Sequence, residues 1–200
     1  MKGYQGILDY VNTTRYYKLW LGSQNGEIEL FGCSDASYKV GNDGKGRLGV
    51  ALFLSPFSGA FCTISRKENT VSHSSMECEI HAVDAVIRYI IYFRELLSEI
   101  NIIQNKPTKL YMDSKSGIQL CETMKNNFRT RHMTVNVAFI REQINARIVE
   151  LIFVRDEYNV ADILTKLPLS KERHMINTRR ILEGFTHEEW ERMNSNNNNK

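Results

Sequence analysis

Three short β-rich segments precede the first long helical pattern, and this arrangement restricts the fold. They cover residues 28–34 (IELFGCS), 48–54 (LGVALFL) and 60–65 (AFCTIS), separated by loops that contain Gly or Pro. Strands joined by short loops pair in an antiparallel meander. A helical pattern then runs from about residue 76 to residue 99. We therefore expect three antiparallel strands followed by a long helix.

Strands and helices alternate in the remainder of the chain. The predicted elements are a strand at 109–113, helices at 116–124 and 133–144, a strand at 149–154 and a helical pattern at 159–166. Because strands that are joined through helices lie parallel, the fourth and fifth strands should extend the sheet in parallel. The pattern predicts an α/β fold, a mixed five-stranded sheet in the order β-β-β-α-β-α-α-β-α with helices on both faces.

Composition narrows the class of protein further. The 200 residues are enough for one domain with a substantial core. The longest apolar run is well short of the roughly 20 residues that cross a membrane. The start of the chain lacks the pattern of a secretory signal, which favours an intracellular protein. The four cysteines are scattered and indicate reduced, buried side chains. A net charge of +3 is compatible with a polyanionic partner.

Three aspartates occupy similar places in their predicted elements. Asp35 follows the first strand, Asp113 ends the fourth, and Asp162 lies in the first turn of the helix after the fifth. Ligands of open α/β sheets collect at the carboxyl ends of the strands. Each aspartate alone has an ordinary explanation as a turn or helix-start residue. Together they predict a cation site, because adjacent like charges destabilise a fold unless a cation neutralises them.

Two glutamates at the start of the long helix have different predicted roles. Ser74 and Glu77 fit a capping box, in which the Glu77 carboxylate reaches back to the Ser74 N–H and faces solvent. Glu79 shares its helix face with Val83 and Ile90, so it should face the sheet. A carboxylate on a buried face needs a cation. We expect Glu79 to join the three aspartates in an oxygen-rich site suited to Mg²⁺ or Mn²⁺.

Five short sequence blocks occur in order along the chain: SDAS (34–37), SSMECEIHA (74–82), YMDSKS (111–116), RTRH (129–132) and NVADILTK (159–166). Together they resemble the signature blocks of the RNase H domain of copia-type retrotransposon polyproteins. Residues 1–27 resemble the stretch that joins reverse transcriptase to RNase H in that family. The expected organisation is a connecting remnant (1–27), an RNase H domain (28–170), a helical extension (171–193) and a disordered Asn-rich tail (194–200).

The resemblance implies an RNase H-like fold and endonucleolytic hydrolysis of the RNA strand of RNA–DNA hybrids. The family's four metal-binding carboxylates fall on Asp35, Glu79, Asp113 and Asp162. Two Mg²⁺ ions are implied, with Mn²⁺ as a substitute. In this assignment Asp35 bridges the ions, Asp113 and Glu79 bind on one side, and Asp162 holds the ion that activates water.

The resemblance also implies partners and a setting. The candidate substrate-binding residues are Arg66, Lys67, Lys115, Arg129, Arg131 and His132. They would contact the phosphates and 2′-hydroxyls of the hybrid. An upstream reverse transcriptase domain in the parent polyprotein is the expected protein partner, and no membrane is involved. The expected location is a cytoplasmic virus-like particle, with the nucleus as a second compartment.

Two other functions remain open at the level of sequence. One is a catalytically silent retroelement remnant, or a nucleic-acid-binding module of the same fold. The presence of all four carboxylates favours activity over that alternative. The other is an integrase-like nuclease, which would use three acidic residues with a different final spacing. The ADILTK segment (161–166) argues against an integrase.

Overall fold

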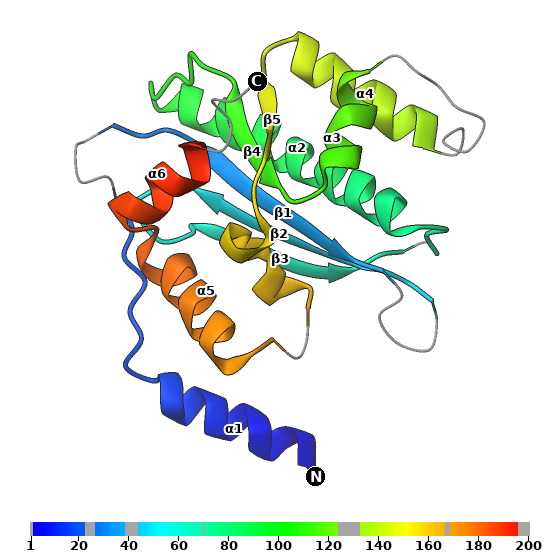
Figure 1. The fold of residues 1–200 in the computed structure, drawn as a ribbon. Helices are drawn as coiled ribbons and strands as arrows, with labels where there is room; N and C mark the ends of the chain where they lie inside the picture. The colour runs from blue at the N-terminus through cyan, green and yellow to red at the C-terminus, as the bar shows by residue number, and fades with distance from the viewer. Residues whose placement is uncertain are drawn as a thin grey trace.

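A mixed sheet forms the centre of the computed structural model (Figure 1). The structure describes residues 2–22, 27–38, 44–69, 71–123, 133–166 and 169–195. Within these residues the sheet has five strands in the order β3-β2-β1-β4-β5. The strands are β1 (Phe31–Ser37), β2 (Arg47–Phe53), β3 (Cys62–Lys67), β4 (Thr108–Met112) and β5 (Val149–Phe153).

The strand pairing confirms the predicted meander and parallel extension. β1 pairs with β2 and β2 with β3 in antiparallel register. β1 pairs with β4 and β4 with β5 in parallel register. Cys33 of β1 lies opposite Tyr111 of β4. Asp35 and Asp113 each follow two residues later, so this register places them side by side.

Helices cover both faces of the sheet (Figure 1). On one face lie α2 (Ser75–Glu99), α3 (Lys115–Glu122) and α4 (Thr134–Asn145). On the other lie the short 3₁₀ segments η2 (Asp156–Tyr158) and η3 (Val160–Leu164) with α5 (Lys171–Glu183) and α6 (His187–Ser195). Alternate side chains of β2 point to opposite faces of the sheet. Leu48, Val50 and Leu52 belong to the core under α2, whereas Ala51 and Phe53 belong to the core on the other face.

The long helix α2 is defined by its cap and by its apolar face. The Ser74 side chain accepts a hydrogen bond from the N–H of Glu77 at 3.2 Å, which satisfies one free donor of the first turn. Ile80, Val83 and Ile87 are fully buried against the sheet. Burial of such a face supplies most of the stability of a helix in a folded domain. This helix carries Glu79 and fixes its direction.

Aromatic packing holds the C-terminal helices on the second face. The rings of Phe31 and Phe53 stack with their centroids 4.8 Å apart. The Trp190 ring of α6 lies 5.0 Å from the Phe31 ring, and Phe185 lies 5.8 Å from Phe53. Offset and tilted aromatic pairs add stability beyond simple area burial. The C-terminal region is thus part of a core and not a loose appendage.

The N-terminal segment contacts this second layer. Helix α1 (Lys2–Thr14) has largely exposed side chains. After it, the N–H of Trp20 donates to the carbonyl of Leu182, and the N–H of Gly59 donates to the carbonyl of Trp20. Among the described residues, none of the helices has the length and apolar character needed to cross a lipid bilayer.

Several predicted boundaries differ from the structure. Asp35 lies inside β1 and not after a strand that ends at residue 34, because the β1–β2 ladder continues to Ser37. The helix predicted at 159–166 is the 3₁₀ segment η3, whose start is fixed by the Asn159 side chain accepting from the N–H of Ala161. Helix α6 continues through Ser195, into the tail predicted at 194–200. Residues 196–200 lie outside the described residues.

Gly49 allows β2 and η3 to approach closely beside Asp35, its partner in the β1–β2 ladder. A Cβ at this position would lie 2.7 Å from Cγ2 of Thr165 and 2.9 Å from the carbonyl oxygen of Ala161. We predict that Gly49→Ala destabilises the fold by about 1–3 kcal/mol, because η3 must move. Denaturant unfolding measures this change.

Gly6→Ala is the matched control. A Cβ at Gly6 in α1 meets nothing within 4 Å. Alanine is favoured over glycine inside a helix by about 1 kcal/mol, so this change should leave the free energy of unfolding equal or slightly higher. Equal stability of both variants would contradict the close packing of η3 on β2.

Candidate active site

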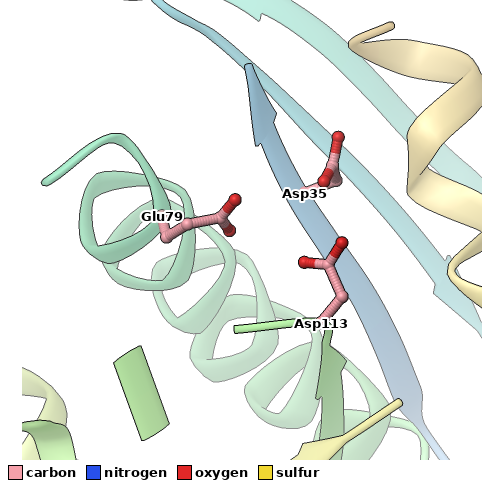
Figure 2. A group of neighbouring side chains, drawn as sticks. All are labelled: Asp35, Glu79 and Asp113. Atoms are coloured by element: carbon pink, nitrogen blue, oxygen red, sulfur yellow. The ribbon is translucent and has the colours of Figure 1, made fainter. Parts of the chain in front are cut away.

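Three carboxylates converge at the end of the β1–β4 pair. Figure 2 shows the side chains of Asp35, Glu79 and Asp113 pointing toward one another. Asp35 lies on β1, Asp113 follows β4 directly, and Glu79 extends from the second turn of α2. One carboxylate oxygen from each lies within 4.8 Å of the others. The structure thus brings together three of the four predicted site residues as one group, called the inner group below.

Asp162 belongs to a second group, called the outer group. One oxygen each of Asp113, Asp156 and Asp162 lie within 4.8 Å of one another. Asp113 therefore connects the two groups. Asp162 is fully buried on η3, whereas Asp156 on η2 is exposed. Asp156 was not predicted as a site residue. Its place in the segment between β5 and the Ala161-Asp162 pair is the sequence signal that could have indicated it.

A lysine amine lies among the aspartates. The Nζ atom of Lys166 is 2.7 Å from Asp162, 3.2 Å from Asp156, 3.4 Å from Asp35 and 3.7 Å from Asp113. Its backbone N–H donates to the carbonyl of Asp162 at 2.9 Å. Lys166 was recognised only as the last residue of a sequence block, because its side-chain neighbours come from four other elements or loops.

Arg173 of α5 holds the outer group from the other side. Its guanidinium donates to the Asp162 carboxylate and, at 2.6 Å, to the Asp156 carboxylate. It also donates to the main-chain carbonyl of Asp156 at 2.5 Å. Both carboxylate oxygens of Asp162 therefore have cationic donors, Lys166 on one and Arg173 on the other. The sequence placed Arg173 in a helical extension and gave it no role.

Two polar side chains fix η3 against the sheet. The Asn159 amide donates to the carbonyl of Ser34 at 2.9 Å, and Asn159 is fully buried. The hydroxyl of Thr165 donates to the Asp35 carboxylate. These bonds join η3 to β1 on both sides of Asp162, so the positions of Asp35 and Asp162 depend on each other.

Burial and nearby acidic groups raise the pKa values of Asp35 and Glu79. Burial raises the pKa of Asp35 to about 7, with Lys166 opposing and Asp162 adding to the shift. Burial, Asp35 and Asp113 together raise the pKa of Glu79 to about 9. Burial lowers the pKa of the Lys166 ammonium, but Asp35 and Asp162 outweigh it, so that pKa is raised. Without a bound cation, the inner group therefore keeps a proton at neutral pH.

The inner group has the features expected of a site for a hard divalent cation. Oε2 of Glu79 is buried and has no hydrogen-bond donor, and the buried Oδ1 of Asp35 has only the ion pair with Lys166 at 3.4 Å. The Asp35 side chain is only 1% exposed. Buried polar atoms without partners are rare and call for an explanation such as an ion. The metal ligands that the inner group offers are carboxylate oxygens, which suit Mg²⁺, Mn²⁺ or Ca²⁺.

Glu77 differs from its predicted solvent-facing role. Its backbone N–H completes half of the capping box with Ser74, as predicted. Its carboxylate, however, accepts from the N–H of His73 at 2.5 Å, and the residue is only 6% exposed. His73 belongs to the loop between β3 and α2, and the same loop carries Glu68, which binds His81 of α2 at 2.8 Å. The fold of this loop against the start of α2 has no periodic signal in the sequence.

The predicted substrate-binding residues separate into three sets. Lys115 begins α3 two residues after Asp113, and its Nζ lies 4.5 Å from the centre of the Phe153 ring. Arg66 and Lys67 are exposed on β3, and Arg66 lines a separate groove of about 440 Å³ beside α2. The predicted residues Arg129, Arg131 and His132 lie outside the described residues.

The raised pKa of Glu79 predicts a pH-dependent stability in the metal-free protein. Folded Glu79 holds its proton up to about pH 9, whereas the unfolded chain releases it near 4.5. The folded state thus binds more protons, and stability falls as pH rises from about 4.5 to about 9. Glu79→Gln should remove this loss and exceed the native chain by about 2–4 kcal/mol at pH 8 in a chelating buffer.

Urea unfolding at pH 5 and pH 8 measures the effect. Glu99→Gln, at the exposed end of the same helix, serves as the control for the loss of one acidic side chain. Its stability should follow that of the native chain at both pH values. A constant difference between Glu79→Gln and the native chain across this range would contradict the buried position of Glu79.

Sequence comparison relates the chain to transposon polyproteins. No protein-family model matches it. It is 28% identical over 155 residues to the retrovirus-related Pol polyprotein from transposon TNT 1-94 of Nicotiana tabacum, covering 74% of this chain and 12% of that protein. It is 29% identical over 168 residues to the Pol polyprotein from transposon RE2 of Arabidopsis thaliana, covering 82% and 11%. A Ty1-NL2 Gag-Pol polyprotein of Saccharomyces cerevisiae is 28% identical over 153 residues, covering 74% and 8%.

Structural comparison identifies the fold. LC11-RNase H1, isolated from compost by a metagenomic approach, matches with a TM-score of 0.55 and 16% identity, over 69% of this chain and 93% of that one. The PFV RNase H domain matches with a TM-score of 0.51 and 13% identity, over 77% and 99%. The chain spans about a tenth of the length of the curated relatives it matches. It has the RNase H fold and is homologous to one segment of retrovirus-related Pol polyproteins from plant and yeast transposons, which confirms the predicted resemblance.

Proposed function

We propose that this chain is a ribonuclease H that hydrolyses the RNA strand of RNA–DNA hybrids. One observation carries the proposal. In an RNase H fold, the carboxylates of Asp35, Glu79 and Asp113 converge at the end of two adjacent parallel strands, and Oε2 of Glu79 is buried without a hydrogen-bond donor. Ligands of open α/β sheets bind at this edge. Bringing these negative charges together costs free energy of folding, and a bound cation that acts on a substrate would offset that cost.

The proposal assigns the two carboxylate groups to two Mg²⁺ positions. The inner group of Asp35, Glu79 and Asp113 would hold one ion, and the outer group with Asp162 would hold the other. When bound, such a pair activates a water molecule and stabilises the leaving oxygen of an in-line displacement. Mn²⁺ would substitute, because it favours the same oxygen ligands.

The chain's own residues contribute position and charge. β1 and β4 hold Asp35 and Asp113 on rigid backbone, and α2 fixes Glu79 through its buried face. Asn159 and Thr165 keep η3 against β1, so Asp162 stays in place. Asp35 and Glu79 must release their protons to bind a cation, and their raised pKa values make that release pH-dependent.

The substrate assignment follows the sequence resemblance and the polyprotein relatives. Lys115, close to Asp113 in the chain, is the proposed phosphate contact nearest the carboxylates. Arg66, Lys67, Arg129, Arg131 and His132 are further proposed contacts to the backbone of the hybrid. Contacts to 2′-hydroxyls distinguish an RNA strand from a DNA strand. The proposed setting is reverse transcription, with a reverse transcriptase domain of the parent polyprotein as the partner.

Cleavage of a labelled RNA–DNA hybrid in Mg²⁺ tests the proposed activity. The native chain should cut the RNA strand of the hybrid and should not cut a DNA duplex of the same sequence, which serves as the control substrate. Asp113→Asn removes a charge that both groups share, so its cleavage rate should fall by more than about 100-fold. Equal rates for the two proteins would refute the proposal, as would hybrid binding without cleavage by the native chain. The salt dependence of hybrid binding separates poor binding from an inactive site.

The two glutamates of α2 give a sharper comparison. Glu79→Gln should abolish cleavage, because it removes a charged ligand of the inner group. Glu77→Gln keeps an oxygen that can accept from the N–H of His73, so its cleavage rate should stay within about twofold of native. Both changes are isosteric and lie two residues apart. Greater loss of cleavage in Glu77→Gln would refute the assignment of Glu79.

A further inference from the structure

The ion pairs of Lys166 are divided unevenly between the two carboxylate groups. Its Nζ atom pairs with all three members of the outer group, Asp113, Asp156 and Asp162, at 3.7, 3.2 and 2.7 Å. Of the inner group it also reaches Asp35, at 3.4 Å, but none of the described ion pairs joins it to Glu79. The amine therefore lies on the outer side of the site, where the second divalent cation is proposed to bind.

The hydrogen bonds show the same asymmetry. In the inner group, Oε2 of Glu79 has no hydrogen-bond donor, and Oδ1 of Asp35 has only the 3.4 Å ion pair with Lys166. In the outer group, both oxygens of Asp162 accept from cationic side chains, and Asp156 accepts from the same two. The described ion pairs thus leave Glu79 of the inner group without a cationic partner, whereas Asp156 and Asp162 of the outer group each have two.

We propose that Lys166 is a built-in counter-ion of the outer group and that a divalent cation binds there only when its amine withdraws. The inference rests on the proposed function for the role of the second ion. An ammonium and a divalent cation cannot both lie within 3–4 Å of the same oxygens without strong repulsion. The two divalent cations therefore bind in separate steps, the inner one more tightly and the outer one in competition with Lys166.

Lys166 is suited to leave, and Arg173 is suited to stay. The Lys166 side chain is 35% exposed and has a flexible four-carbon stem with a single charged end. Its backbone N–H stays bonded to Asp162, so the amine can swing out without movement of the chain. Arg173 contacts two carboxylates and a main-chain carbonyl through a planar fork. Arg173 thus keeps the loop in place in both states.

Metal binding to Lys166→Gln tests the competition without using any substrate. Calorimetric titration of Mn²⁺ into the metal-free protein should show the weaker binding step tightened about tenfold or more, and the tighter step changed less. In chelator, the variant should melt about 2–4 °C lower than the native chain, because the outer carboxylates lose a counter-charge. Lys171→Gln, which removes one exposed lysine from the start of α5, should change neither quantity.

The outcomes separate this inference from the proposed activity. An outer step that is unchanged or weaker in Lys166→Gln, or no Mn²⁺ binding to either protein, would overturn it. Tightened binding without any hybrid cleavage by the native chain would support the counter-ion and refute the nuclease. If Lys166→Gln fails to fold, Lys166→Arg should fold and weaken the outer step, since arginine binds carboxylates through two donors. A tighter outer step in Lys166→Arg would contradict the inference.

Discussion

The parallel pairing of β1 with β4 is the constraint on which the site depends. It places Asp35 beside Asp113, at positions 78 residues apart in the chain, and α2 then adds Glu79. Asp35 and Glu79, buried beside other acidic groups, resist ionisation, and their pKa values are raised. The Lys166 ammonium offsets part of the charge at Asp35 and Asp113, and the Arg173 guanidinium offsets that of Asp162. The charge arrangement follows from the strand order.

The C-terminal helices link this site to the second core. Arg173 of α5 binds the outer carboxylates, and the same helix leads through Phe185 to Trp190 of α6. Trp190 packs on Phe31 at the start of β1, the strand that carries Asp35. The region after residue 170 therefore packs on the start of β1 and also contacts the outer carboxylates. Without α5, Asp162 would keep only Lys166 as a cationic partner.

The antiparallel meander, the parallel direction of the later strands, the long helix and the sheet-end positions of the carboxylates could be predicted from the sequence, because they depend on periodicity and strand ends. The place of β4 beside β1 could not, because nothing in the sequence marks which edge of the meander is extended. Glu79 lies on the sheet side because its helix phase matches Val83 and Ile90. The burial of Glu77 could not be predicted, since its carboxylate bonds to His73 in the loop before α2, whose fold leaves no periodic pattern. The positions of Lys166 and Arg173 depend on a 3₁₀ turn and on the approach of α5, which leave no periodic pattern.

The backbone bonds at Trp20 bear on where the folding unit begins. The segment at 20 lies between the end of α5 and the loop before β3, where it accepts from Gly59 and donates to Leu182. A chain shortened to start at residue 28 would leave both of these main-chain groups without their partners. Part of the stretch that the sequence marks as a connector is therefore bonded to the second layer. A boundary at residue 28 would cut through these hydrogen-bonded contacts.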